Sequence, residues 1–276
     1  MHLVMAAVAL LLSWGVRWQG KGVLGWQGVL GYFLFPPVLL WSTAVATLGM
    51  CPDHLTLLHG DDYLMHGLAL GLLGLTVGCG MSLVRQGRHL NQLLRDYPQI
   101  MVRGRAALLM PEPSLFIAQV GFWKTQLVVS QGLLNALSPG QLEAALCHEE
   151  AHAYYRDTFW FFWLGWVQRA TAWLPQSRLL WQELLALREL RADRWSCERT
   201  DPLLLAEALL LVVAHPTAHT QVWSAGMADT DYRLGERVQA LLQPLPTKPT
   251  TNWLWVWLLL ALLPLLAIPL HLGCLV

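Results

Sequence analysis

The stretch CHEEAHAYYRD, residues 147–157, places two histidines four positions apart with two glutamates between them. Positions four apart on an α-helix face the same side, so His148 and His152 can bind one metal ion through their ring nitrogens. Glu149 lies beside them, where a carboxylate can take a proton from a bound water. The stretch therefore predicts a helix carrying an HExxH zinc site. The alternative is a polar stripe on an ordinary helix, since a chance match is on the order of one in a hundred.

The start of this helix is marked by local signals. Ser138 precedes Gln141 by three residues and Pro139 lies between them, which is a capping box with proline at the first helical position. We therefore expect the helix to begin at about residue 139 and to run as far as Leu174, where Pro175 stops it.

A third metal ligand is expected further along the chain. In LRELRADRW, residues 187–195, Glu189 and Asp193 are again four apart on one helical face. One carboxylate can bind zinc, and the other can accept the spare N–H of a ligating histidine. The alternative is that both acidic residues pair with Arg188, Arg191 or Arg194 on a solvated face.

The segments around the motif predict a small sheet followed by helices. Short apolar runs broken by PEP and GFWK indicate strands. The expected strands are 106–110, 115–120 and 126–130, and the further helices are 178–199, 202–214 and 231–242. The basic stretch 85–105 is interpreted as a juxtamembrane segment.

The composition indicates a membrane protein. The chain is 55% hydrophobic and only 13% charged, and it contains 15 Trp. Crossing a bilayer as helix needs about 20 apolar residues. Four transmembrane helices are therefore predicted, at about 3–16, 28–50, 63–84 and 253–270. The domains expected are the three N-terminal spans in 1–84, a metal-site domain in 85–251 and the last span in 252–276.

Lys and Arg in the flanks of the spans predict the orientation. Basic residues follow the first and third spans, and none lies between the second and third. The N-terminus and a short C-terminus are therefore expected outside, residues 85–251 in the cytosol, and no external sensor domain. A net charge of zero with no long basic run argues against nucleic acid as a partner. The five scattered cysteines, Cys147 among them, are expected to be buried thiols.

The segment from residue 158 to residue 174 begins with an aromatic run whose apolar part is too short to span a bilayer. Residues 158–167 amount to about 15 Å of helix, half of a hydrocarbon core. We expect this segment to dip into the cytosolic interface of the lipid bilayer and to bring the metal site to the membrane surface. The alternative is a buried helix in the core of the cytosolic domain.

Residues of this chain also resemble a known family. LVVSQGLLNALSPGQLEAALCHEEAHAYYRD followed by ELRAD is similar to the integral-membrane zinc metallopeptidases of the BlaR/MecR antirepressor type, and more distantly to the HtpX-like and CAAX-prenyl endoproteases. The resemblance covers about residues 100–242 and includes AHP at 214–216 and ERVQALL at 236–242. It implies a mainly α membrane protein with a cytosolic α+β gluzincin-like peptidase domain. It further implies His148, His152 and Glu189 as ligands of one Zn²⁺ per chain, Glu149 as general base and Asp193 as the outer partner of a ligand.

The function expected from these features is a zinc-dependent endopeptidase acting on a regulatory or membrane-associated protein near the cytosolic face. Its protein substrate should lie extended and pair with an edge of the sheet. By the resemblance alone, His215 or Arg237 is the candidate donor to the oxyanion. Two alternatives stay open. One is a non-proteolytic signal transducer or scaffold with a closed, four-ligand structural zinc site, and the other is an interaction protein without metal.

Overall fold

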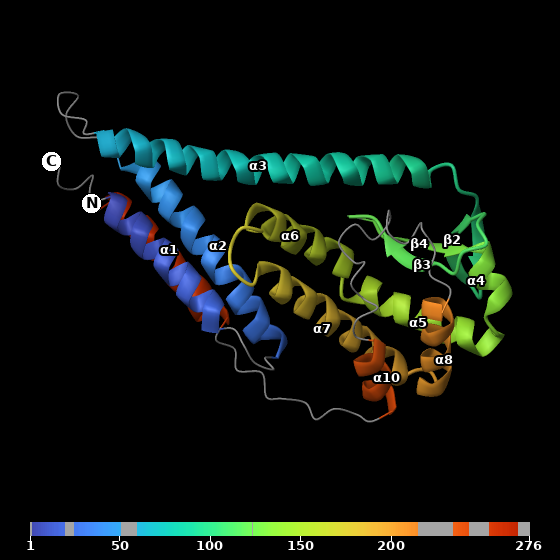
Figure 1. The fold of residues 1–276 in the computed structure, drawn as a ribbon. Helices are drawn as coiled ribbons and strands as arrows, with labels where there is room; N and C mark the ends of the chain where they lie inside the picture. The colour runs from blue at the N-terminus through green and yellow to red at the C-terminus, as the bar shows by residue number, and fades with distance from the viewer. Residues whose placement is uncertain are drawn as a thin grey trace. The chain divides into compact units, whose positions relative to one another are not determined.

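The computed structural model describes residues 2–19, 25–50, 60–122, 124–214, 234–242 and 254–269 (Figure 1). The chain is mostly helical, with a small mixed sheet. It divides into two compact units. The helical unit comprises residues 1–82, 166–184 and 248–276, and the sheet unit comprises residues 83–165 and 185–247. The helices α3, α6 and α7 each contribute to both units.

The helical unit is built around α2, Trp26–Gly49, which contacts α1, His2–Gln19, and α11, Leu254–Ala261. A 3₁₀ turn, η2, follows at Leu263–Leu266. Apolar side chains of these helices form one core, together with a residue from the turn between α6 and α7. Its buried members are Ala9, Phe35, Leu39, Leu40, Leu174 and Ala261.

Two adjacent prolines lie inside α2 without ending it. Pro37 has no N–H to offer the carbonyl of Phe33 four residues earlier. Arg17 of α1 takes its place, because its Nη2 donates to the Phe33 carbonyl oxygen at 3.0 Å. The side chain of Arg17 is fully buried and its guanidinium also lies over the Phe33 ring, 5.4 Å from the centroid. A neighbouring helix thus satisfies the carbonyl that the proline leaves unpaired, as helix bundles in membranes require.

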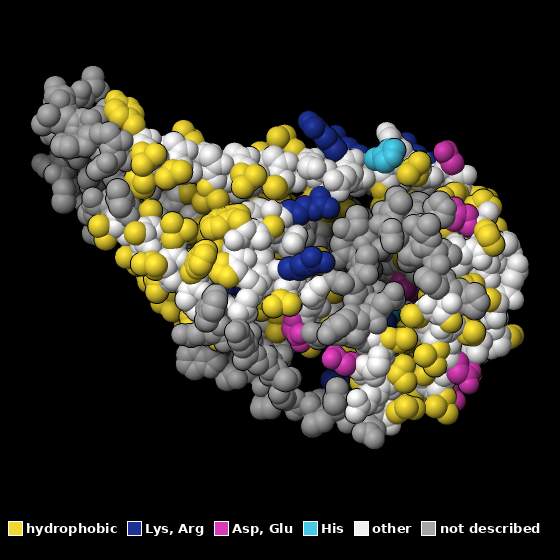
Figure 2. Space-filling model, viewed as in Figure 1, with side chains coloured by type: hydrophobic (Ala, Val, Ile, Leu, Met, Phe, Trp, Pro, Cys, Tyr) yellow, Lys and Arg dark blue, Asp and Glu magenta, His cyan; other side chains and the backbone are white. Residues whose placement is uncertain are grey.

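Two described helices are long and apolar enough to cross a membrane: α2 and the part of α3 from Tyr63 to Leu94. The apolar window of α2 is largely buried in the protein, whereas that of α3, Gly60–Leu94, is largely exposed. Hydrophobic side chains are spread over the N-terminal part of α3 (Figure 2). Among the described residues α1 and α11 are shorter than a span, so the predicted four-helix membrane arrangement stays a prediction.

The sheet unit contains a four-stranded sheet of order β1-β2-β4-β3. β1, Gln99–Val102, is antiparallel to β2, Arg105–Met110. β2 is parallel to β4, Gln126–Ser130, and β4 is antiparallel to the edge strand β3, Ile117–Val120. The three strands expected from the sequence are therefore confirmed, with small changes at their ends.

The backbone of β3 has two differently directed sets of polar groups. The Ser130 N–H donates to the Phe116 carbonyl oxygen at 2.9 Å, so this pair faces across the sheet. Because hydrogen-bonded pairs alternate in an antiparallel ladder, Ala118 and Val120 also face β4. The N–H and C=O groups of Ile117 and Gln119 then point away from β4, toward the free edge.

After β4, the chain continues as helices that lie wholly or partly in the sheet unit. They are α4, Gln131–Ala136, α5, Pro139–Tyr154, α6, Asp157–Ala170, α7, Ser177–Cys197, α8, Pro202–Ala214, and α10, Leu234–Leu242. A core of apolar side chains joins the sheet to α4, α5 and α8. Its fully buried members include Val129, Leu133 and Leu146.

One expectation from the sequence needs correction, and one strand was not predicted. The helix expected to run from residue 139 to Leu174 ends at Tyr154, because Arg156 adopts a left-handed backbone (φ 54°) and α6 starts afresh at Asp157. The stretch 85–105, interpreted as a juxtamembrane segment, contains the end of α3 and the strand β1, which was not predicted. A tight turn joins β1 to β2, since Arg103 and Gly104 both have positive φ, the geometry of a two-residue hairpin.

Candidate metal centre

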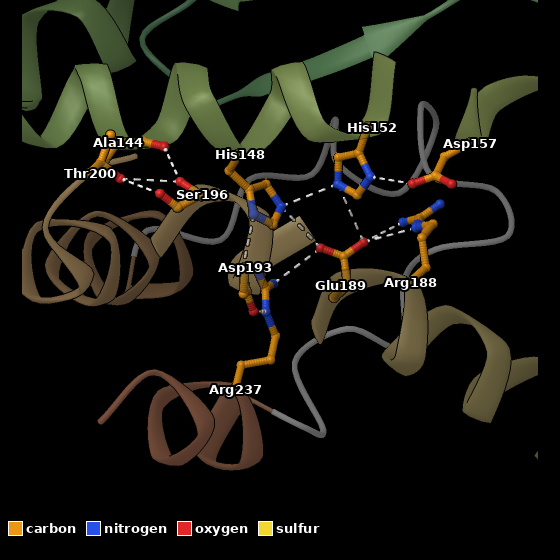
Figure 3. Close-up of polar contacts among 10 residues, drawn as sticks. All are labelled: Ala144, His148, His152, Asp157, Arg188, Glu189, Asp193, Ser196, Thr200 and Arg237. Atoms are coloured by element: carbon orange, nitrogen blue, oxygen red, sulfur yellow. Dashed lines mark hydrogen bonds and ion pairs between the residues drawn. The ribbon is translucent and has the colours of Figure 1, made fainter. Parts of the chain in front are cut away.

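The first two candidate ligands are fixed by α5. The Ser138 hydroxyl accepts the N–H of Gln141, and the Gln141 side chain accepts the N–H of Ser138, so the predicted capping box is present. This cap sets where the helix begins and therefore which face carries the histidines. His148 and His152 are both buried, and their side chains point from α5 toward α7 (Figure 3).

Three side chains converge at one point between the two helices. The Nε2 atoms of His148 and His152 are 3.1 Å apart. A Glu189 oxygen lies 3.3 Å from the His148 Nε2, and the other lies 3.7 Å from the His152 Nε2. Ligand atoms about 2.1 Å from a tetrahedral ion are about 3.4 Å from one another. His148, His152 and Glu189 are thus spaced as a group that could hold a metal ion.

Each histidine is held from behind by a carboxylate. The Nδ1 of His152 lies 2.8 Å from Oδ2 of Asp157, the first residue of α6. The Nδ1 of His148 lies 2.9 Å from Oδ1 of Asp193, in an ion-pair contact off the line of the ring N–H. Carboxylates in these positions fix the ring orientation and tautomer of a ligating histidine and increase its basicity.

Arginines in turn hold the carboxylates. Arg237 of α10 donates to both oxygens of Asp193, at 2.8 and 2.7 Å, and its third nitrogen lies 3.3 Å from Glu189 (Figure 3). Arg188 donates to Oε1 of Glu189 from two nitrogens, at 2.9 and 2.6 Å. Its guanidinium also lies over the Phe161 ring of α6, at 4.8 Å. This arrangement leaves Oε2 of Glu189 as the oxygen that faces His148.

Burial and these contacts change the acidity of the groups. Burial of His148 disfavours its charged form, but the contacts with Asp193 and Glu189 outweigh this and raise its pKa to about 9. Burial opposes ionisation of Glu189 and Asp193, but the positive charges of Arg188 and Arg237 hold the pKa of both carboxyls below the usual range. A metal ion would replace the proton on His148, so we expect metal binding to release a proton near neutral pH.

Glu149 is held at the free edge of the sheet. Its Oε2 accepts the backbone N–H of Gln119 in β3, at 2.9 Å, and its side chain is buried. The N–H of Gln119 is one of the groups directed away from β4. The carboxylate next to the two histidines therefore lies where an added strand would pair with β3.

The donor set fits zinc better than the hard cations. Two imidazoles and one carboxylate are typical of catalytic zinc sites, whereas calcium and magnesium prefer oxygen ligands alone. Over the described part of the chain, no fourth protein donor joins His148, His152 and Glu189. Three protein ligands leave one position of a tetrahedral ion for water.

The sequence-predicted residues have different outcomes. The structure brings His148, His152 and Glu189 together, with Asp193 behind His148, while the Glu149 carboxylate is directed to the N–H of Gln119. Arg237 is also at the site, but its nitrogens are directed at Asp193 and Glu189. His215 lies outside the described residues. Cys147, next to His148, is buried away from this group.

Asp157 and Arg188 belong to the site and were missed in the sequence. Asp157 was counted within one continuous helix, where a residue five positions after His152 would not face it. The break at Arg156 turns the chain so that Asp157 returns to His152. Arg188 was considered only as a partner for a solvated acidic pair. In the structure both Arg188 and Glu189 are buried.

Comparison of the chain with protein-family models, with curated proteins and with solved structures finds no match.

Proposed function

We propose that this chain is a membrane-embedded, zinc-dependent endopeptidase with one Zn²⁺ held by His148, His152 and Glu189. One observation carries the proposal: Glu149, which follows the candidate ligand His148 in α5, is buried and accepts a hydrogen bond from the edge strand of the sheet. A purely structural metal site has no use for a carboxylate at an edge where a peptide can be added. The open fourth position among the described donors also favours catalysis over a structural site.

The proposed reaction assigns a separate task to each group. When bound, zinc would polarise the scissile carbonyl and lower the pKa of a water from about 15.7 toward 7. Glu149 takes a proton from that water and passes it to the nitrogen of the leaving amine, as a general base and then a general acid. Asp157 and Asp193 keep the two imidazoles oriented. Arg188 and Arg237 keep Glu189 and Asp193 ionised and in place.

The substrate is proposed to bind as an extended strand along β3. The backbone groups of Ile117 and Gln119 point to the free edge, so a peptide can pair with them largely independently of its own sequence. Such a strand would approach the N–H of Gln119 that Glu149 now accepts. The substrate backbone and the Glu149 carboxylate that transfers the proton would then both lie next to Gln119.

The apolar helices suggest on which side of a membrane the substrate lies. We propose four transmembrane helices with the N-terminus outside and the sheet unit in the cytosol, so that the substrate is a regulatory or membrane-associated protein. Alkylation of single cysteines introduced into the segments that join the helices, in intact cells and in broken cells, tests this orientation. Reagent access from outside to residues 85–105 would contradict it.

The test of the activity is the substitution Glu149→Gln, compared with Glu150→Gln. Glu150 is the adjacent glutamate, but it is half exposed and pairs with Arg105. Full-length protein of both variants should retain stoichiometric zinc. We expect peptide hydrolysis by Glu149→Gln to fall by a factor of about 10² to 10⁴, and Glu150→Gln to keep its activity. Wild-type hydrolysis by Glu149→Gln would remove this residue from the mechanism.

A further inference from the structure

An aromatic cluster joins the β3–β4 turn to the first half of α6. The ring of Phe122 lies 5.2 Å from that of Phe159, 4.5 Å from Phe162 and 6.1 Å from Trp163, measured between centroids. Gly121 allows the turn that presents Phe122, because it has φ +119° and a Cβ there would lie 2.3 Å from the Lys124 carbonyl oxygen. We call Phe122, Phe159, Trp160, Phe162 and Trp163 the aromatic surface.

Part of this surface is open rather than buried. The side chains of Trp160 and Trp163 are 56% and 42% exposed, and they are three positions apart on one face of α6. The other face of the helix is buried through Phe161 and Leu164. Large exposed aromatic patches mark interaction sites, and tryptophan in particular is enriched at the interface between lipid and water.

The continuation of α6 indicates which partner the surface meets. In the helical unit the Trp166 ring stacks on that of Trp41 in α2, with centroids 5.3 Å apart. Its Nε1 donates to the Thr76 carbonyl oxygen in α3, at 2.7 Å. Over the described part of the chain, α2 and the part of α3 from Tyr63 to Leu94 are long and apolar enough to cross a membrane. Trp166 is therefore a part of α6 packed against candidate membrane spans.

The helical rise places the exposed tryptophans close to that point. At 1.5 Å per residue, Trp163 and Trp160 lie about 4.5 Å and about 9 Å along α6 from Trp166. Along α6, the exposed tryptophans therefore lie within two turns of the residue that packs against α2 and α3.

Positive charge accompanies the aromatic surface. Lys124 follows Phe122 by two residues, and Arg156 immediately precedes α6. Both side chains are exposed, and neither forms an ion pair with the described residues. On α3, the exposed Arg85 and Arg88 follow the apolar part of the helix. Cations with no ion-pair partner among the described residues, next to exposed tryptophans, complement an anionic phospholipid surface, which attracts each nearby Lys or Arg.

We propose that the aromatic surface, with Lys124 and Arg156, is a docking site for the headgroup layer of a bilayer that contains anionic phospholipid. The same helix begins at Asp157, the partner of His152. Docking would hold the metal centre at the level of the membrane surface and would confine hydrolysis to bonds close to it. The lipid contact itself does not depend on the proposed peptidase activity, so the two proposals fail separately.

Spin labels on the full-length protein test the docking. Labels are placed singly at Trp160→Cys and Trp163→Cys in a variant without its native cysteines, and the control label is at Met101→Cys. Met101 is an apolar residue of the same unit, more exposed than either tryptophan, and it lies on the edge strand β1. In nanodiscs containing phosphatidylglycerol we expect oxygen to relax the first two labels more than a water-soluble nickel chelate does, and the reverse at Met101. Nickel access at Trp160 and Trp163 equal to that at Met101 would overturn the proposal.

The charges are tested by reversing them. With Lys124→Glu and Arg156→Glu combined, the Trp160 label should gain nickel access in discs with phosphatidylglycerol and change little in discs of phosphatidylcholine alone. An unchanged label in both disc types would refute the role of anionic lipid. The unsubstituted protein gives an independent reading, since a phospholipid with a photoreactive headgroup should modify residues 157–163. Labelling absent from this peptide would refute the docking even if a cysteine variant misfolds.

Discussion

Asp157 provides a sharp test of the metal centre, because its role depends on the three-dimensional structure and not on the HExxH motif. Its Oδ2 lies 2.8 Å from the Nδ1 of His152, and Oδ1 contacts Arg191. The side chain of Asp157 is only 3% exposed. Water therefore screens its charge little, and the carboxylate acts on the histidine at close to full strength. The perturbation is Asp157→Asn, with Asp157→Ala as the larger change.

The expected loss follows from what each substitution keeps. Removing the outer partner of a ligating histidine lowers metal affinity about 10- to 100-fold, or by about 1.4 to 2.7 kcal/mol. Asn keeps an oxygen that can accept from His152 but loses the negative charge, so we expect about a tenfold loss of zinc affinity. Ala loses the hydrogen bond as well and leaves a buried imidazole unsupported. We expect about a 100-fold loss for Asp157→Ala.

The affinity is measured by competition between full-length protein and a chromophoric zinc chelator, and circular dichroism checks that each variant is folded. The matched control is Arg191→Gln. This change removes the second partner of Asp157 but leaves the contact with His152. Arg191 is 30% exposed, so water can take over part of its contact with Asp157 when the guanidinium is removed. We therefore expect the control to lose less zinc affinity than either Asp157 variant.

Wild-type zinc affinity in both Asp157→Asn and Asp157→Ala would refute the reasoning. The orientation of His152 would then be set by packing alone. A loss in Arg191→Gln as large as in Asp157→Asn would also contradict it, because the effect would come from the ion pair at the helix start.

Three further outcomes are expected. Arg237→Met removes both hydrogen bonds from Arg237 to the buried Asp193 and leaves His148 beside it. Breaking such a buried pair costs about 3 to 5 kcal/mol and should lower the melting temperature by roughly 10 °C; an unchanged transition would contradict the pairing. Gln119→Pro removes the N–H that Glu149 accepts and that a paired substrate would approach. It should lower kcat/KM about tenfold with zinc content unchanged, whereas Ala118→Pro, whose N–H faces β4, should unfold the strand. A chelator should lower the melting temperature, and free zinc at about 100 times its Kd should restore about 2.7 kcal/mol of stability; a transition insensitive to both would count against a bound ion.

The sequence predicts those features that depend on neighbours along the chain. Ser138, Pro139 and Gln141 define the start of α5 by local hydrogen bonds, and the structure confirms it. The spacing of His148 and His152 is a property of any helix, so their common face follows directly. The strands 106–110, 115–120 and 126–130 and the helix Pro202–Ala214 were also identified by apolar runs and turn residues.

Features set by distant contacts were not accessible in this way. Arg156 has a positive φ, which the sequence does not announce because the residue is neither Gly nor Asn. The sequence therefore did not predict the helix break at Arg156 or the contact of Asp157 with His152. β1 is only four residues long and its turn uses Arg103 and Gly104, so it resembled a basic flank. The pairing of Arg237 with Asp193 joins residues 44 positions apart.

The aromatic run illustrates an intermediate case. Its composition predicted either an interfacial segment or a buried core helix. In the structure α6 has a buried face and an exposed face in the sheet unit, and its last turn packs against α2 and α3 in the helical unit. Neither expectation predicted that α6 would have both a buried and an exposed face, because the sequence pattern does not tell which other helices pack against it.

Zinc absorption spectroscopy on full-length protein purified without added metal, together with its metal content, tests the central claim most directly. The account predicts one zinc ion per chain with two imidazole nitrogens from His148 and His152, one carboxylate oxygen from Glu189 and one oxygen from water. Glu189→Ala should lose the carboxylate signal together with most of the metal. A chain that retains no zinc, or a site closed by four protein ligands, would contradict the account.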